Sequence, residues 1–276
     1  MPIRELLLLQ SFTDKTFEKF RQLIHENSGI CFGDAKKDTL RVKLEKLMSK
    51  NRICSYNEYY NMLVADKCKR LIMELVNEIT INKTNFFREN NHFDFIRNKI
   101  QFIMEKNQRI LKNKEIRVWS TACSTGEEAY SIAITLKDCL PDEINIRILA
   151  TDICSNVLST ALKGIYPLHI KDEVGNSYVA RYFENTGDSY KVADEIKNLI
   201  TFRQFNLMDL FPFTNTFDMI FCRNVIIYFD SGTQQSLVEK FYNITTPGGL
   251  LFLGHSESLI NKKHRYQYIQ PTIYMK

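Results

Sequence analysis

The stretch Ile116-Arg117-Val118-Trp119-Ser120-Thr121-Ala122-Cys123-Ser124-Thr125-Gly126-Glu127-Glu128 passes from an apolar run through small residues into a helical pattern. The apolar run Ile116–Ser120 predicts a strand, and the pattern Glu127–Leu140 predicts a helix. The small side chains between them let the backbone approach a ligand closely, and the helix start presents unpaired N–H groups. The stretch therefore predicts a strand–turn–helix unit that can hold a ligand.

The composition of this turn argues against a dinucleotide ligand. The turn contains one glycine, Gly126, and so lacks the GxGxxG pattern of dinucleotide-binding turns. Glu127 and Glu128 would repel a pyrophosphate but suit a ligand with a positive centre, such as the sulfonium or amino group of S-adenosyl-L-methionine (AdoMet). The alternative is an ordinary turn whose glutamates begin the helix, where the helix dipole favours negative charge. The segment alone does not decide between these interpretations.

Short apolar runs alternate with helical patterns from about Glu115 to the end of the chain. The runs are Ile116–Ser120, Ile146–Thr151, Ile200–Phe205, Phe217–Cys222 and Leu250–Gly254, and the helical patterns between them are Glu127–Leu140, Ser155–Lys163 and Gln234–Asn243. This alternation is typical of βαβ units on a parallel sheet. We therefore predict a Rossmann-like α/β domain, which the segment Tyr266–Met275 closes with a further β element.

The chain before this domain has helical patterns only. They contain Phe17, Phe20 and Ile24, then Leu40, Leu44 and Leu47, then a capping box over Ser55–Glu58, and finally the run Leu71–Ile79. The first pattern ends at Asn27-Ser28-Gly29, a typical helix stop. We predict a helical domain over residues 1–80 and an α/β domain over residues 81–276, with a connecting helix near Phe93–Lys106.

Polar residues follow two further predicted strands. Asp152 ends the second run, where a carboxylate can accept hydrogen bonds from ribose hydroxyls, although a lone aspartate there is more often a helix cap. Asn206 and Leu207 follow the third run, and an amide beside an apolar side chain can hold adenine. Because ligands bind outside the carboxyl ends of parallel strands, these residues are candidates for the same site as the glycine turn.

The composition is that of an ordinary globular protein. The net charge of +5 and the pI near 8.7 are far from the imbalance expected of a dedicated nucleic-acid binder. The seven cysteines form no CxxC pair and no Cys/His cluster with zinc spacing, so we expect reduced thiols and no metal site. No apolar run approaches the roughly 18 residues of a membrane span. We expect a cytoplasmic protein that neither inserts into membranes nor binds nucleic acid.

Three further motifs carry a more specific resemblance. The fourth run continues as Arg223-Asn224-Val225-Ile226-Ile227-Tyr228-Phe229-Asp230, and an arginine at the end of an apolar strand needs a partner because an unpaired buried charge is costly. The other two motifs are Gly254-His255-Ser256-Glu257-Ser258 and Asn82-Lys83-Thr84-Asn85-Phe86-Phe87-Arg88. Together, and in this order, the motifs resemble the chemotaxis receptor methyltransferase (CheR) family. The resemblance covers nearly the whole chain.

The resemblance implies a class I AdoMet-dependent methyltransferase domain with a Rossmann-like, mainly parallel seven-stranded sheet. A small all-α domain would precede it, and a small β insertion would lie at about residues 170–198. AdoMet would be the cofactor and S-adenosyl-L-homocysteine the product. The resemblance places cofactor contacts on Asn82, Thr84, Arg88, Glu128, Asp152, Asn206, Leu207, Cys222 and Arg223. It also places Arg223 and Tyr228 beside the reacting groups.

The implied reaction transfers a methyl group to glutamate side chains of methyl-accepting chemotaxis receptors, forming methyl esters in chemotactic adaptation. A free glutamate has a pKa of about 4.3, so the carboxylate is already ionised at neutral pH and needs no general base. Arg223 would hold the incoming carboxylate through paired N–H bonds, and Tyr228 would donate one hydrogen bond. We expect Arg223→Ala to abolish methylation in a protein that stays folded.

A basic segment offers a surface for the receptor. The segment from Lys36 to Arg52 contains seven basic residues and two acidic ones. Within it, Lys43, Lys46 and Lys50 form a stripe at helical spacing. A solvated helix face is the ordinary interpretation of such a stripe, but the resemblance favours docking to acidic receptor helices.

The predicted β insertion bears on a second mode of receptor binding. In some family members it carries a glycine-rich loop that captures a carboxyl-terminal receptor pentapeptide. Here Thr186–Val192 is short and has one glycine. We therefore expect a monomer that does not depend on a receptor pentapeptide.

Other functional classes have less support in the sequence. The chain lacks the (Asn/Asp)-Pro-Pro-aromatic motif of amino-group methylation and the Pro-Cys nucleophile of C5 methylation. It also lacks the glycine fingerprint of a dehydrogenase. A non-catalytic AdoMet sensor or scaffold is the alternative from a different class. Intact Arg223, Asn224 and Tyr228 favour an enzyme.

Overall fold

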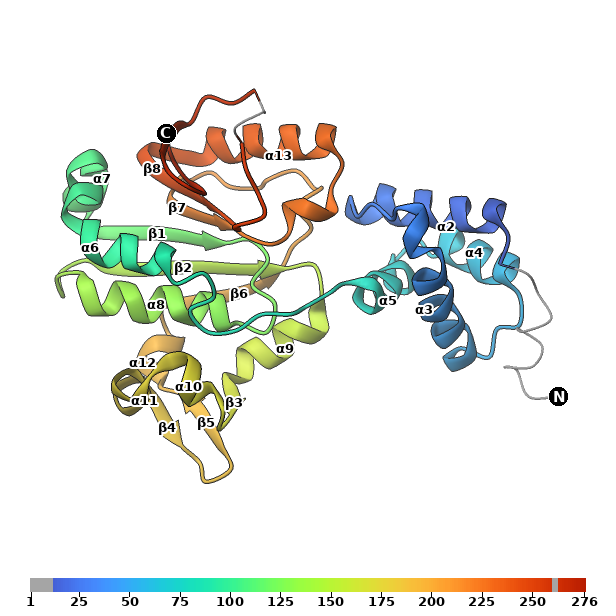
Figure 1. The fold of residues 1–276 in the computed structure, drawn as a ribbon, viewed down its shortest axis with the longest axis horizontal. Coiled ribbons are helices and arrows are strands. Elements are labelled where there is room, and N and C mark those ends of the chain that lie inside the picture. Colours follow the sequence, from blue (N-terminus) through green and yellow to red (C-terminus); the bar gives the residue numbers. More distant parts are fainter. Residues whose placement is uncertain (1–11, 260–262) are drawn as a thin grey trace. The chain divides into compact units, whose positions relative to one another are not determined.

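The computed structural model describes residues 12–259 and 263–276, which form two compact units. The first unit runs to Ile81 and also includes Tyr228–Asp230, and the second contains Asn82–Ile227 and Ser231–Lys276. Figure 1 shows the helices of the first unit and the sheet of the second. Among the helices of the described residues, none combines the length and the apolar character that crossing a membrane requires.

The described residues of the first unit form helices and no strand. Its elements are α2 (Asp14–Ser28), the 3-10 helix η1 (Asp34–Lys36), α3 (Lys37–Lys50), α4 (Tyr56–Ala65) and α5 (Arg70–Ile79). Gly29 ends α2 in the left-handed conformation, with φ of 72°, as the stop signal predicts. The capping box predicted at Ser55 is wrong in detail, because α4 begins after Ser55 but the Ser55 side chain forms no capping hydrogen bond. A cluster of buried side chains from all four α-helices forms the core.

The second unit contains a seven-stranded sheet. Its strands are β1 (Glu115–Ser120), β2 (Asn145–Asp152), β6 (Ile200–Gln204), β7 (Phe217–Cys222), β8 (Thr245–Leu253), β9 (Gln267–Gln270) and β10 (Ile273–Met275). Their order is β6-β2-β1-β7-β8-β10-β9. The first five strands in this order pair in parallel, and β10 is antiparallel to both β8 and β9. The prediction of a mainly parallel seven-stranded sheet is confirmed.

The strand order reverses between β1 and β7. From β1 the chain proceeds outward through β2 to β6, and it then returns to place β7 on the other side of β1. The longer helices around this sheet include α6 (Asn91–Lys106), α7 (Gln108–Asn113), α8 (Glu127–Cys139), α9 (Ser155–Lys163) and α13 (Ser231–Ile244). Because parallel crossovers are right-handed, α8 and α9 lie on one face and α13 on the other, as Figure 1 shows. Ligand sites of such sheets lie at the reversal.

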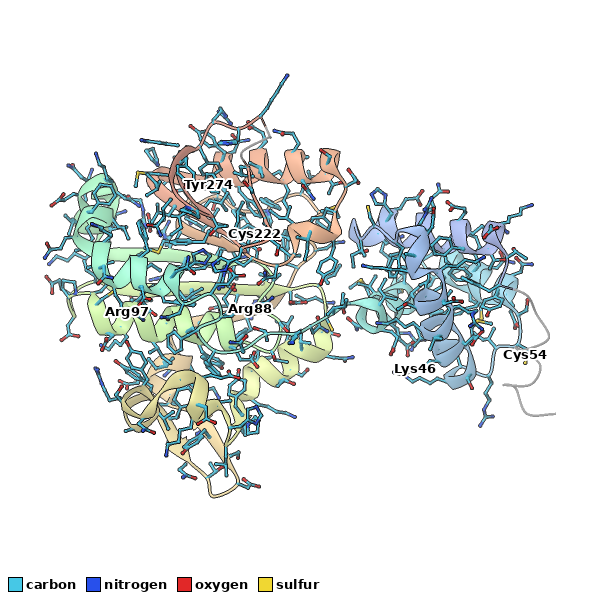
Figure 2. All side chains as sticks on the ribbon, in the orientation of Figure 1. Lys46, Cys54, Arg88, Arg97, Cys222 and Tyr274 are labelled. Atoms are coloured by element: carbon cyan, nitrogen blue, oxygen red, sulfur yellow. The ribbon has the colours of Figure 1, made fainter. Side chains whose placement is uncertain are left out.

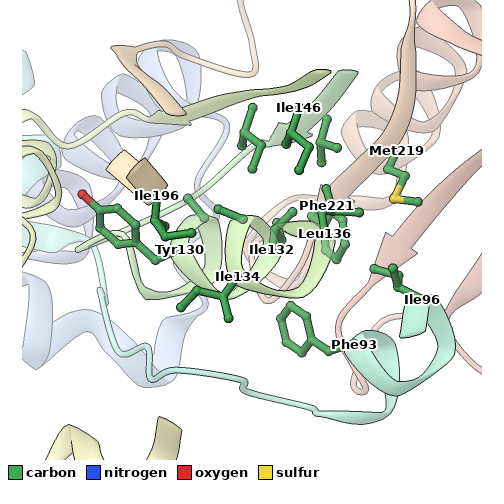
Figure 3. Close-up of a cluster of buried hydrophobic side chains, with 14 of the residues drawn as sticks. Phe93, Ile96, Tyr130, Ile132, Ile134, Leu136, Ile146, Ile196, Met219 and Phe221 are labelled. Carbon is green, nitrogen blue, oxygen red and sulfur yellow. The ribbon is translucent and has the colours of Figure 1, made fainter. Parts of the chain in front are cut away.

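Buried side chains fill both faces of this sheet. On one face, α8 packs against the strands and against α6; Figure 3 shows Phe93 and Ile96 of α6 near Phe221 of β7. On the other face, Trp119 is fully buried among five phenylalanine rings, including Phe241 of α13. These contacts explain why the strands read as continuous apolar runs rather than as alternating ones.

A second, three-stranded antiparallel sheet lies between β2 and β6 in the chain. It consists of β3 (Ile165–Pro167), β4 (Phe183–Asn185) and β5 (Ser189–Val192), with the short helices α10 (Ile170–Val174), α11 (Asn176–Tyr182) and α12 (Asp194–Lys197) around it. Its first strand precedes residue 170, where the sequence places the start of the β insertion. A periodic pattern cannot reveal a strand of three residues.

Candidate functional site

The turn after β1 depends on Gly126. Gly126 has φ of 100° and directly precedes α8, and Ser124 also adopts a positive φ, of 49°. A Cβ atom on Gly126 would lie 2.9 Å from Cβ of Ala161 and 3.0 Å from the Tyr166 hydroxyl. Backbone conformation and close packing therefore both require glycine here, which fits the predicted close turn.

Asp152 holds this turn in place. One oxygen of its carboxylate accepts a hydrogen bond of 2.9 Å from the Ser124 backbone N–H, and the other accepts one of 2.9 Å from the Cys154 N–H. Burial raises the pKa of Asp152, and these backbone hydrogen bonds offset part of that effect. Asp152 thus joins the ends of β1 and β2, and its predicted contact with a ribose stays a prediction.

Arg223 directly follows β7 and lies at the centre of a cluster of charged side chains, with 1% of its own side chain exposed. One Nη atom lies 3.1 Å from the Glu128 carboxylate, and the other lies 3.1 Å from the Glu89 carboxylate and donates to the Arg88 carbonyl. The guanidinium of Arg223 is thus paired with two carboxylates of the protein itself. The predicted contact of Arg223 with an incoming substrate carboxylate stays a prediction.

Glu89 is the residue of this cluster that the sequence did not reveal. Besides Arg223, its carboxylate accepts hydrogen bonds from the Asn224 amide at 3.2 Å and from the His255 N–H at 3.1 Å. Burial acts to raise the pKa of Glu89, but Arg223 and these hydrogen bonds outweigh it and lower the pKa. The position of Glu89 directly after the Asn82–Arg88 motif is the sequence feature that could have identified it as a candidate site residue.

Glu257 organises the turn that follows Arg223. Its carboxylate accepts hydrogen bonds from the N–H groups of Asn224, Gly254 and Ile227, at 2.8, 2.6 and 3.3 Å. Asn224 has φ of 56°, so the chain reverses sharply there. The motif Gly254–Ser258 therefore supplies a carboxylate that fixes the backbone around Arg223, and His255 lies at its exposed edge.

The cluster carries more negative than positive charge. The Glu128 carboxylate interacts with the carboxylates of Glu89 and Glu257 and with the Arg223 guanidinium. Burial raises the pKa of Glu128, with Arg223 and the Ser120 hydroxyl acting in the opposite direction. Nε of Arg223 is buried and has no hydrogen-bond partner among the residues the structure describes. A ligand with positive groups would balance the excess negative charge, and a hydrogen-bond acceptor on it could pair with Nε of Arg223. AdoMet has both kinds of group.

The other predicted cofactor residues lie around the same strand ends. The Asn82 carbonyl accepts from the Ser124 hydroxyl at 3.0 Å, and its amide lies 3.8 Å from the Cys154 sulfur. The Arg88 guanidinium donates to the Lys83 carbonyl. Figure 2 shows Arg88 and the fully buried Cys222 toward the carboxyl end of the central strands. The remaining three residues are Thr84, which is half-buried, Leu207, which is buried, and Asn206, whose side chain accepts from the Met208 N–H.

Tyr228 belongs to the first unit, with the helices of the amino-terminal part. Its carbonyl accepts a hydrogen bond of 2.8 Å from the Cys31 N–H, and the Lys36 ammonium lies 5.9 Å from the centre of its ring. The predicted role of Tyr228 beside the reacting groups stays a prediction.

The lysine stripe also lies in the first unit, and each of its members has a partner on α5. Lys43 donates to the Glu78 carbonyl at 2.7 Å, Lys46 to the Glu78 carboxylate at 2.9 Å, and Lys50 to Glu74 at 2.7 Å. The side chains of Lys46 and Lys50 are 68% and 70% exposed, whereas Lys43 is partly buried. Burial lowers the pKa of Lys43. Lys46 and Lys50 are thus the more exposed members of the stripe, and the predicted docking role of all three lysines stays a prediction.

Comparisons with known proteins match nearly the whole chain. Residues 82–275 match the family model described as CheR methyltransferase, SAM binding domain, and residues 15–80 match CheR methyltransferase, all-alpha domain. The chain is 37% identical to a chemotaxis protein methyltransferase of Borreliella burgdorferi, over 96% of this chain and 95% of that protein. It is 34% identical to a chemotaxis protein methyltransferase of Escherichia coli, over 97% and 94%. A solved glycopeptide N-methyltransferase in complex with SAM aligns with 50% of this chain and 43% of its own, at 13% identity and a TM-score of 0.33.

Proposed function

The chain belongs to the CheR family of SAM-dependent chemotaxis methyltransferases, and from this premise we propose that it methylates glutamate side chains of chemotaxis receptors. The product would be a glutamate methyl ester on a cytoplasmic receptor helix. The observation that carries the proposal is the meeting of three separate motifs at the reversal of the strand order. Arg88, Arg223 and the Glu257 carboxylate all contribute to one buried cluster there.

In this proposal, AdoMet is held by the residues around the ends of β1, β2, β6 and β7. Bound AdoMet supplies an electrophilic methyl group on a sulfonium. Glu128 provides negative charge for its positive groups, and Asp152 keeps the glycine turn in position for the ribose. The cofactor contacts we propose are Asn82, Thr84, Arg88, Glu128, Asp152, Asn206, Leu207, Cys222 and Arg223.

The protein needs no general base for this reaction, because the substrate glutamate is already ionised at neutral pH. Its main contribution is to align the carboxylate with the methyl group, and alignment supplies roughly 7–11 kcal/mol in favourable cases. Arg223 contributes by holding Glu89 and Glu128 in fixed positions. Tyr228 donates a hydrogen bond that orients the substrate carboxylate. Burial of the cluster excludes water, which strengthens these electrostatic interactions.

Incubation with methyl-labelled AdoMet and receptor-containing membranes tests the proposal. We expect label on the receptor that mild base releases, as carboxyl methyl esters require. Tyr228→Phe should lower the labelling rate with little change in AdoMet affinity. Tyr268→Phe serves as the matched control, because Tyr268 is 52% exposed on β9 and should label at the normal rate. Label on nucleic acid, or no label on any acceptor, would contradict the proposal.

The β4–β5 hairpin supports a receptor interaction that needs no pentapeptide tether. Residues 186–188 connect the two strands, and the loop closes on itself through hydrogen bonds between Thr186 and Ser189 and between Asn185 and the Gly187 N–H. Side chains of the loop therefore already use hydrogen-bonding groups that a bound peptide would otherwise need. We expect no binding of an isolated receptor-tail pentapeptide in calorimetry, and measurable binding would overturn this part of the proposal.

A further inference from the structure

The end of α2 brings a histidine and a cysteine to the same place. His25 lies in the last turn of α2, and Gly29 then reverses the chain in the left-handed conformation. Cys31 follows two residues later, and its backbone N–H bonds to the Tyr228 carbonyl. The reversal returns Cys31 toward the helix end that carries His25.

Asp230 completes this cluster within the first unit. Its carboxylate oxygen Oδ2 lies 2.8 Å from Nε2 of His25 and 3.9 Å from Sγ of Cys31. One ligand atom from each of the three residues lies within 4.8 Å of the other two. The side chains of His25 and Asp230 are 43% and 42% exposed, so an ion and its water can reach the cluster.

We propose that His25, Cys31 and Asp230 bind a zinc ion, with water in the fourth position. Zinc binds imidazole nitrogen, thiolate sulfur and carboxylate oxygen at roughly 2.0–2.3 Å, in tetrahedral geometry. Ligand atoms around such an ion lie roughly 3.3–3.7 Å apart. The distances of 2.8 and 3.9 Å therefore need only small side-chain shifts, in which the ion replaces the hydrogen bond between His25 and Asp230.

The donor set selects this kind of ion. A hard cation such as Mg²⁺ takes oxygen ligands, whereas a site with one sulfur, one nitrogen and one oxygen suits zinc or cobalt. Burial and the Asp230 carboxylate raise the pKa of the Cys31 thiol, while the nearby Arg21 lowers it. Because zinc binds the thiolate form, binding at this site would release the thiol proton.

A second group of possible ligands in the described residues is less suited to a cation. Glu89, His92 and His255 also lie within 4.8 Å of one another. However, the Glu89 carboxylate is already paired with the Arg223 guanidinium. A cation here would face a buried arginine.

Zinc in this site would join two distant parts of the sequence. Cys31 and Asp230 are 199 residues apart, and the Cys31 backbone already bonds to Tyr228, two residues before Asp230. The ion would hold the segment Tyr228–Asp230 against the end of α2. We expect slower hydrogen exchange at the Cys31 amide when zinc is bound.

Titration of the reduced, unsubstituted protein with Co²⁺, without AdoMet, tests the site independently of methyl transfer. We expect one equivalent to bind with a thiolate-to-cobalt charge-transfer band, and Zn²⁺ to displace it. Cys31→Ser should remove the band. His25→Gln and Asp230→Asn should weaken binding by at least about 10–100-fold. Cys68→Ser is the matched control, because Cys68 is an exposed thiol of the same unit and should leave the band unchanged.

X-ray absorption at the zinc edge keeps the test decisive if a variant folds poorly. One sulfur among the ligands of the unsubstituted protein supports the site, and ligation by nitrogen and oxygen alone overturns it. The proposal also fails if the unsubstituted protein gives no cobalt band, if the band persists in Cys31→Ser, or if Cys68→Ser abolishes it.

Discussion

Replacing Arg223 by methionine keeps most of the side-chain volume but removes the positive charge between two buried carboxylates. Arg223 is 1% exposed, and its Nη atoms lie 3.1 Å from both Glu89 and Glu128. Removing one partner of a buried ion pair typically costs 3–5 kcal/mol, because the remaining charge is left uncompensated. We therefore expect Arg223→Met to lower the free energy of unfolding by about 3–5 kcal/mol. We expect Arg223→Ala to cost at least as much.

A double-mutant cycle with Glu89→Gln separates this electrostatic effect from loss of packing. Glu89→Gln alone should cost about 1–2 kcal/mol, because Arg223 keeps Glu128 and the amide oxygen can still accept from Asn224. The double variant leaves one uncompensated carboxylate instead of two. We expect it to be more stable than the sum of the single effects by about 1–3 kcal/mol.

Urea unfolding followed by tryptophan fluorescence measures these changes in the second unit. The chain contains one tryptophan, and Trp119 is fully buried in the core of that unit. Arg181→Met with Asp138→Asn provides the control cycle, because this ion pair is exposed and should couple by less than about 1 kcal/mol. Additive effects in the Arg223–Glu89 cycle would refute the inference that the two charges stabilise each other.

Three further predictions follow from the site and from the docking surface. Gly126→Ala should cost about 1–3 kcal/mol in urea unfolding and weaken AdoMet binding, because its φ is 100° and its Cβ would meet Ala161; a cost below about 0.5 kcal/mol would count against the close turn. Changing Lys46 and Lys50 to glutamine should raise KM for receptor more than it lowers kcat, and an unchanged KM would favour a merely solvated helix face. Burial raises the pKa of the Glu128 carboxyl group, although Arg223 acts in the opposite direction. The folded protein therefore keeps the carboxyl proton to a higher pH than the unfolded chain does. Ionisation of Glu128 thus lowers the free energy of unfolding as pH rises from about 4.3 through the pKa of the folded state. Because the proposed contact with AdoMet favours the ionised carboxylate, the stabilising effect of AdoMet on Tm should grow with pH over this window. This pH dependence should be lost in Glu128→Gln, and equal pH profiles of the two proteins would exclude the contact.

The strands, the helices and the glycine turn follow from local features of the sequence. The runs at Ile116–Ser120 and Phe217–Cys222 are mostly apolar and do not alternate with polar residues, because both faces of the sheet are covered, and this pattern is typical of buried parallel strands. Gly126 and Gly29 mark points where the backbone needs a positive φ, which a single residue type reveals. Strand β3 has three residues and was missed, because its pairing with β5 defines it rather than any pattern of its own.

Which charges meet was decided by the tertiary structure. The sequence predicts that Arg223 needs a partner. Glu89 lies 134 residues away in the chain, and no local pattern shows that its carboxylate pairs with the guanidinium of Arg223. The partners of Lys46 and Lys50 on α5, and the meeting of Asp230 with His25 and Cys31, likewise depend on how separate elements pack. Hydrophobic periodicity is a property of neighbouring residues, whereas the partner of a charge depends on the distance in space that folding alone sets.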